Sequence, residues 1–357
     1  MTSNWAITRC RDRLTRLAGT RLDSASFRQE TVRELKQVIG FDGWCWSSTD
    51  PLTGVPTTGL AVNPAMKGAQ RQLFELEYGA GDVNDYRGLA RTKGLGRLFA
   101  ATGGNPGQCR RWSELLGPSG VGDELRATFA ERGKCWGHLV LYRGSDSRPF
   151  TGADAAVLGP LLRDWAARHR HEVQAALASS PPASSPEAEA GQAVVLLDAS
   201  HKPVAHSELA ARLLATLPHR PERGDPPLVV TALAAWLTAC GQRAASPPVP
   251  VFDTTGRWQI VQAHRLDGAV APDTIAITLA VATPAQLAPL AMAAAGLTPR
   301  EQEITALVLA GLPTTEIAAA AHIAPCTVQD HLRGVFRKLA VADRHQLTAR
   351  LLHRPIG

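Results

Sequence analysis

The sequence lacks the features that mark several other classes of protein. Its 357 residues contain no unbroken run of about 18 apolar residues, so we expect no membrane span. The opening segment, MTSNWAITRCRDRLTRLAG, has no apolar core followed by a small-residue cleavage site, and we expect no secretory signal. The six cysteines are scattered without a CxxC pair, which argues against a disulfide framework or a zinc site. We therefore predict a cytoplasmic protein with reduced thiols.

Enzyme signatures are also missing. The sequence contains no phosphate-binding GxxxxGKS or GxxxxGKT, no GxSxG nucleophile turn and no HExxH zinc motif. The glycine-rich stretch at 101–107 lacks the strand-to-helix context of a nucleotide loop. We expect no catalytic residues, no metal site and no cofactor, so the protein is not predicted to be an enzyme.

The composition is that of a folded protein, because 45% of the residues are hydrophobic and 20% are charged. At about 150 residues per domain, the length predicts two to three domains. The 38 Lys and Arg residues outnumber the 32 Asp and Glu residues. The resulting net charge of +6 permits a polyanionic partner without identifying one.

A Ser- and Pro-rich segment at 179–191 divides the chain. It reads SSPPASSPEAEAG, a composition that builds no buried face. We predict a flexible linker here, with a first domain over 1–178 and a second over 192–283. A third domain is predicted over 296–357, after an Ala- and Pro-rich stretch at 282–295.

The first two predicted domains mix helix and strand patterns. In the first, the apolar spacing from Phe27 to Ile39 predicts a helix, and WGHLVLY at 136–142 predicts a buried strand. Thr151 and Asp154 form a capping pattern for a long helix towards Leu177, which could pack on its own domain or pair with its copy in a dimer. In the second domain we predict strands at 193–198, 251–253, 258–264 and 275–281, a further short strand that begins at Val204, and helices at 207–217 and 228–240.

The last block predicts four short helices. Thr298 as N-cap, Pro299 at the first position and Glu301 three residues on satisfy the amides of a helix start. The third helix, from about Pro325 to Leu339, has one apolar face, formed by Val328, Leu332, Val335 and Leu339. Its opposite face carries side chains that can reach base edges and phosphates, namely Gln329, Asp330, Arg333 and Arg337.

This arrangement follows the logic of a helix-turn-helix. A short helix and a tight turn precede a helix with an apolar back and a polar front, and that second helix enters the major groove. Residues 324–357 hold six basic and two acidic residues, whereas 296–323 hold one basic and three acidic. The small net charge of the block predicts modest non-specific affinity, so we expect that useful binding requires a dimer.

The block resembles a LuxR-type helix-turn-helix domain. The resemblance rests on motifs in family order, namely LTPRE at 297–301, Gly311-Leu312, Glu316-Ile317-Ala318, Thr327-Val328, His331, Lys338-Leu339 and Arg344. It assigns roles to three sets of residues. Base contacts are expected from Gln329, Asp330 and Arg333. Contacts to the DNA backbone are expected from Thr327, Arg337 and Lys338. The fourth helix, around Leu347 and Leu351, is expected to form the dimer contact.

Five positions bear on how the sequence departs from the family pattern. Ala324 and Pro313 stand where Ser is usual, so two helix caps are lost, each worth about 1 kcal/mol. Pro325, at a first helical position, compensates in part. Gln329 replaces the usual Lys and can still pair with adenine. Gly334 stands where Asn is common and is expected to expose the helix backbone.

The N-terminal part, about 20–178, resembles the GAF-like sensory region of actinobacterial LuxR-family regulators. This rests on DPLTGVP, LARTKGLGRLFAATGGNP, GVGDELRATF, WGHLVLYR and PFTGAD. Residues 191–283 are similar to a PAS-like domain, through VVLLDASHKPVAHSELAARLL. The implied fold is multidomain: an α+β GAF-like domain, a smaller α+β PAS-like domain and an all-α four-helix LuxR-type domain.

Aromatic and thiol side chains of the first domain have two readings each. Trp44, Trp46 and Trp136 could line a ligand cavity, but we expect them in the core, where most such residues lie. We expect Cys45 and Cys135 to be inert buried thiols, because no nearby cation pattern would lower their pKa.

We therefore predict a homodimeric transcription regulator that binds promoter DNA. A small-molecule effector and RNA polymerase are its further candidate partners, and no membrane partner is expected. Two alternatives stay open. One is a sigma-factor-like promoter-binding module, although no second promoter-binding region is visible upstream. The other is a signalling protein that acts by protein–protein docking without binding DNA.

Overall fold

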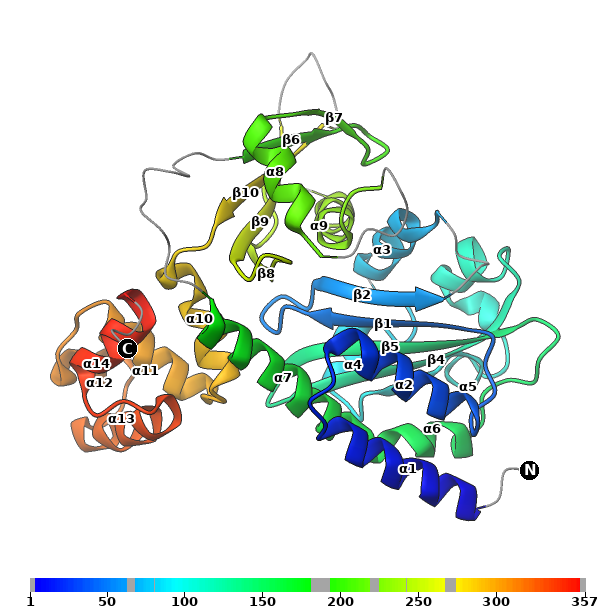
Figure 1. Ribbon diagram of the computed structural model, residues 1–357, viewed down its shortest axis with the longest axis horizontal. Helices are drawn as coiled ribbons and strands as arrows, with labels where there is room; N and C mark the ends of the chain where they lie inside the picture. The colour runs from blue at the N-terminus through cyan, green and yellow to red at the C-terminus, as the bar shows by residue number, and fades with distance from the viewer. Residues whose placement is uncertain are drawn as a thin grey trace.

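The computed structural model describes residues 4–62, 68–79, 81–180, 193–218, 225–241, 243–266 and 274–353. Figure 1 shows three bodies. We call them the first sheet unit (within residues 4–180), the second sheet unit (within 193–281) and the helical head (within 295–353). The linker predicted at 179–191 falls outside the described residues except for Ser179 and Ser180. Within the described ranges, no helix is long and apolar enough to span a membrane.

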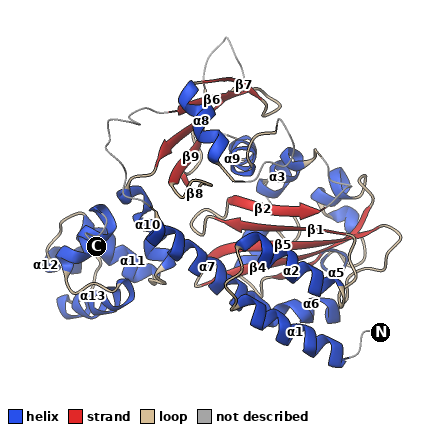
Figure 2. Ribbon diagram, viewed as in Figure 1, coloured by secondary structure: helices blue, strands red, loops and turns tan. Residues whose placement is uncertain are grey.

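The first sheet unit is built on five antiparallel strands in the order β2-β1-β5-β4-β3 (Figure 2). The strands are β1 (Gly43–Thr49), β2 (Pro56–Val62), β3 (Leu95–Arg97), β4 (Val121–Glu131) and β5 (Lys134–Gly144). One face of this sheet forms the core with α1 (Asn4–Ala18), α2 (Ser24–Lys36) and α7 (Leu162–Ser179). Trp46 and Trp136 are buried in this core and Trp44 packs against it, which confirms their predicted place.

The long helix predicted from Thr151 is interrupted. It consists of α6 (Gly152–Leu158), a 3-10 turn (Gly159–Leu161) and α7, and Thr151 and Asp154 form the predicted capping box. The interruption contains Pro160, which has no amide hydrogen to donate and whose ring clashes with the preceding helical turn. Trp165 of α7 is fully buried against the first sheet, so this helix packs within its own unit.

The other face of the first sheet lies towards α3 (Gln70–Tyr78) and α4 (Tyr86–Ala90). Neither helix is predicted by the sequence analysis. Three short helical segments complete the unit, namely α5 (Leu98–Ala101), a 3-10 turn (Pro106–Gln108) and a π turn (Trp112–Leu116).

The second sheet unit has the same strand order as the first, β7-β6-β10-β9-β8, and is also antiparallel. Its strands are β6 (Ala193–Leu197), β7 (Pro203–His206), β8 (Val249–Phe252), β9 (Trp258–Arg265) and β10 (Ile275–Val281). Its helices are α8 (Glu208–Thr216) and α9 (Leu228–Ala239). The strands and helices expected in this region are therefore present, with ends shifted by one or two residues.

The helix α9 joins the two sheet units. Its sequence, LVVTALAAWLTA, is apolar on all sides, and every residue from Leu228 to Leu237 is buried. One side packs on β9 and β10, whereas another side lies against α3 and β2. Val55 of the first unit is fully buried in the same cluster as α9, and Phe74 packs against that cluster. The two sheet units therefore share a packing surface.

The helix α10 (Pro284–Ala294) lies where no element was expected from the sequence. Thr283 caps this helix, and Gln286 three residues on completes a capping box. This is the pattern that identified the helix after Thr298. The signal was present, but the Ala- and Pro-rich composition obscured it.

The helix α10 contributes to the cores of all three bodies. Leu287 and Leu290 pack with Trp258 and Ile260 of the second sheet unit. Ala288 and Met292 belong to the core of the head, and Ala293 and Ala294 belong to the core of the first sheet unit. The Ala294 carbonyl at the end of α10 also accepts hydrogen bonds from two α7 side chains, Gln174 (2.7 Å) and Arg170 (3.2 Å). The helix therefore fixes the head to both sheet units.

The helical head contains the four predicted helices. They are α11 (Pro299–Leu309), α12 (Thr314–Ala320), α13 (Pro325–Leu339) and α14 (Arg344–Thr348), followed by a π turn (Ala349–His353). Thr298 and Glu301 form the predicted capping box of α11. The core of the head includes Ile304, Ile317, Val328 and Leu347, all fully buried.

Candidate nucleic-acid interface

The helix α13 has a closed apolar back. Val328, Leu332, Val335 and Leu339 are at most 5% exposed, and all four pack in the head core. The predicted assignment of these residues to the core is therefore confirmed. The opposite side of α13 is not needed for this core and can make other contacts.

The opposite face of α13 is open to solvent. Gln329, Asp330, Arg333 and Arg337 are all exposed. Arg333 Nη1 lies 2.6 Å from Asp330 Oδ1, but the two side chains are 77% and 66% exposed. Such an exposed pair is worth at most about 1 kcal/mol, so either group can exchange its partner for a base or a phosphate. This face has the donors and acceptors that direct readout requires.

The other two residues predicted to bind DNA are less free. Thr327 is half-buried in the first turn of α13. Lys338 Nζ lies 2.5 Å from Glu301 Oε2, and its side chain is 22% exposed. Burial opposes ionisation of Glu301, but the hydrogen bonds from Lys338 and from the Thr298 amide outweigh it and lower the pKa of this carboxyl. Lys338 must therefore weaken this ion pair to reach a phosphate.

The turns around α12 are held by two arginines to which the sequence analysis gave no role. Arg344 donates to the Leu312 carbonyl (3.1 Å) and to Thr314 Oγ1 (3.0 Å), so it fixes the start of α12. Arg300 donates to the Ala321 carbonyl at the end of α12. The orientation of α12 relative to α13 therefore depends on cations outside both helices.

The departures from the family pattern have structural outcomes. Pro313 and Ala324 occupy the N-cap positions of α12 and α13, and neither side chain makes a capping hydrogen bond. The expected loss of both caps is thus confirmed. For Gly334 the expectation needs correction: a Cβ there would lie 2.8 Å from Glu301 Oε1, so this glycine makes room for the carboxylate that holds Lys338.

Leu347 and Leu351, the residues predicted for dimerisation, lie inside the head. They are 0% and 3% exposed and belong to its core cluster. Their apolar side chains are therefore already covered within one chain. The dimer contact of this last helical segment stays a prediction.

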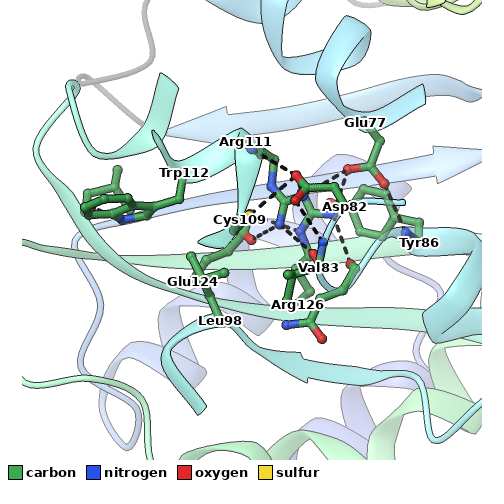
Figure 3. A network of polar contacts seen from close by, with 12 residues as sticks. Glu77, Asp82, Val83, Tyr86, Leu98, Cys109, Arg111, Trp112, Glu124 and Arg126 are labelled. Carbon is green, nitrogen blue, oxygen red and sulfur yellow. Dashed lines mark hydrogen bonds and ion pairs between the residues drawn. The ribbon is translucent and has the colours of Figure 1, made fainter. Parts of the chain in front are cut away.

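A buried network of charges lies on the first sheet (Figure 3). Arg111 pairs with Asp82 (3.0 Å) and Glu124 (2.7 Å), and Arg126 pairs with Glu77 (2.7 Å). Burial opposes ionisation of Glu124, but the two guanidinium groups outweigh it and hold the pKa of this carboxyl below its ordinary value. Sequence reasoning missed this network; charged residues in the strand sequence GVGDELRATF were its only local signal.

Comparisons with known proteins bear on the head. Residues 295–351 match the family model described as bacterial regulatory proteins, luxR family. Among solved structures, Escherichia coli SdiA is similar at 13% identity and a TM-score of 0.34, covering 98% of this chain and 99% of that chain. SdiA in complex with octanoyl-rac-glycerol is similar at 12% identity and a TM-score of 0.32, covering 98% and 95%. No curated protein matches the chain.

The matched residues include the whole of α11, α12, α13 and α14. They contain the short helix, the turn and the amphipathic helix that a helix-turn-helix requires. Residues 295–351 therefore form a luxR-family helix-turn-helix domain, which indicates a DNA-binding transcription regulator.

Proposed function

We propose that this protein is a cytoplasmic, homodimeric transcription regulator in which two N-terminal sensory domains control promoter binding by the head. The proposed domains are a GAF-like domain over 1–178 and a PAS-like domain over 192–283, with a linker at 179–191. The DNA-binding domain covers 296–357. The shared strand order of the two five-stranded sheets supports two related sensory domains.

The observation that carries the proposal is the two-sided character of α13. Its apolar residues are buried inside the head, whereas its polar residues are exposed. The helix itself lies at the outer edge of the molecule (Figure 1). No described part of the chain covers Gln329, Asp330, Arg333 or Arg337, so a duplex can approach without rearrangement of the head.

The proposed contacts follow from side-chain chemistry. Gln329 can donate and accept towards adenine, and Arg333 can donate twice to guanine. Arg337 and Lys338 would neutralise phosphates, and Thr327 would donate to one. A homodimer would read two half-sites about 34–36 Å apart, one helical turn of DNA. Arrangements of the two heads would change with the state of the sensory domains.

The test is selection of binding sites from random duplexes, followed by mobility-shift titration at several salt concentrations. Arg333→Ala is expected to cost about 1–3 kcal/mol and to relax the preference at one base position. Arg337→Ala should weaken binding equally for all sequences and lower the salt slope by about one. Arg212→Ala, at an exposed site on α8, is the control and should change neither.

Two outcomes would count against the proposal. An unaltered base preference in Arg333→Ala would refute this reading face. Absence of any shift across the salt range would favour the docking alternative over a DNA-binding regulator.

A further inference from the structure

A cavity of about 1390 Å³ lies between the two sheet units and is remote from α13. The first sheet unit lines it with residues of β1, β4 and β5, including Ser47, Arg126, His138 and Tyr142. The second sheet unit lines it with α9 and the turn before β7. Its volume exceeds the roughly 300–1,000 Å³ of common ligand sites, so a small organic molecule fits with water beside it.

The strand register explains the floor of the cavity. Cys45 pairs opposite Val140 and Ser47 opposite His138. Because side chains alternate along a strand, these residues share one face of the sheet, and Trp46 points into the core on the other. The cavity and the hydrophobic core of the first sheet unit therefore lie on opposite faces of the sheet.

The opposite wall belongs to the second sheet unit. Thr231 and Trp236 of α9 line it, and each is only 6% exposed. At the edge, Leu228 packs so closely over Gly59 of β2 that an added Cβ there would lie 3.4 Å from Leu228 Cδ2. His201 is 4% exposed, and its Nδ1 atom has no hydrogen-bond partner among the described residues. The cavity is thus complete only when both units are present.

The floor of the cavity is formed by aromatic and polar side chains packed on one another. The Tyr86 ring stacks on His138 with 3.7 Å between ring centroids, and the Arg126 guanidinium lies 4.3 Å from the Tyr86 ring. Tyr142 is 4% exposed and also lines the cavity. Buried polar groups are usually paired, so the unpartnered His201 Nδ1 on the opposite wall is the group best placed to hydrogen-bond a bound molecule.

The charges around the floor disfavour an anion. The network of Figure 3 holds three carboxylates, Glu77, Asp82 and Glu124, against two guanidinium groups, so it carries one excess negative charge. Burial, followed by the charges of Arg126 and His169, lowers the pKa of His138 to about 3, so this ring is neutral. Of the other lining cations, Arg87, Arg91 and Lys202 are exposed and screened by solvent. Arg71 is half-buried, but it pairs with Glu75 (2.8 Å).

We propose that this cavity is an effector site shared by both sheet units, and that it takes an uncharged, largely apolar molecule with one or two hydrogen-bonding groups. This inference rests on the proposed sensory function and adds the ligand class and the second wall. Because α9 forms that wall, an occupant changes the packing between the two units, and α10 connects both units to the head.

The experiment titrates the full-length protein with phenylnaphthylamine, an uncharged dye that fluoresces in apolar sites. Anilinonaphthalene sulfonate has the same ring system with an added sulfonate and serves as the charged counterpart. We expect one saturable phenylnaphthylamine site per chain, with an affinity at least about ten-fold higher than that of the sulfonate. Equal or tighter binding of the sulfonate, or binding without saturation, would overturn the proposed ligand class.

Variants test the shared wall. Ser47→Leu fills the floor and Thr231→Leu fills the α9 wall, and each should weaken dye binding at least about ten-fold. Thr231→Val keeps the shape of the side chain and should bind as the wild type, which shows that the position tolerates substitution. Ala211→Leu, at an exposed site on α8, is the matched control. Loss of binding in Ser47→Leu alone would assign the site to the first unit and refute the shared wall.

The dye titration contains no DNA. Its outcome therefore does not depend on whether α13 binds a duplex, and failure of the DNA experiment would leave it interpretable. Conversely, absence of dye binding would remove the effector site while leaving the reading face of α13 in place.

Discussion

Replacing Arg111 by Met should strongly destabilise the first sheet unit. The Arg111 side chain is 0% exposed and lies 2.7 Å from Glu124, 3.0 Å from Asp82 and 3.9 Å from Glu77. Methionine fills most of the same space but leaves three carboxylates with Arg126 as their only close cation among the described residues. Removing one partner of a buried ion pair costs about 3–5 kcal/mol, because the remaining charge is not compensated.

The neighbouring residue provides a matched control. Arg110 pairs with Glu114, but these side chains are 68% and 43% exposed, so Arg110→Met should cost far less stability than Arg111→Met. Urea unfolding followed by tryptophan fluorescence gives both values. Adding Glu124→Leu to Arg111→Met should recover part of the loss, since it removes one uncompensated carboxylate. Similar costs for Arg110→Met and Arg111→Met would refute the view that burial makes this network important.

Two further predictions concern a cap and a titration. Ala324→Ser should restore the missing N-cap of α13 and raise the stability of the head by about 1 kcal/mol; thermal unfolding measures this, and no gain would mean that Pro325 already compensates. His138 has a pKa of about 3 in the folded chain and about 6.5 when unfolded, so the unfolded chain binds more protons between these values and stability falls as the pH is lowered through them. At pH 5 this effect lowers the free energy of unfolding by about 2 kcal/mol. His138→Phe should remove this pH-dependent loss, whereas His206→Gln, at an exposed site, should leave it unchanged.

The helical head could be predicted in detail because its signals are local. The spacing of Val328, Leu332, Val335 and Leu339 fixes which side of α13 is buried, and a cap three residues before Glu301 fixes where α11 begins. The capping box of Thr283 and Gln286 is the same kind of local signal and would have identified the start of α10. The apolar pattern gave no such help. The amino acids of α10 are small and apolar all along the helix, so there was no stripe to distinguish one side from another.

The cavity and the charge network could not be predicted in this way. Glu77 and Arg126 are 49 positions apart, and their pairing depends on how α3 crosses the sheet. The α9 wall depends on the contact between two separate units, and its uniformly apolar sequence predicts burial without naming the neighbour. Local periodicity shows which side of a helix or strand is buried. It does not show which other element packs against that side, and both the cavity and the charge network depend on that packing.

The position of α10 sets where the head can be cut from the rest of the chain. The luxR-family match begins at residue 295, yet Ala288 and Met292 fill the interior of the head from the preceding helix. A fragment or chimera starting at residue 295 would leave that space open to water. One starting at Thr283 would keep the capping box and both side chains, but it would also expose Leu287 and Leu290, the surface that normally rests on β9.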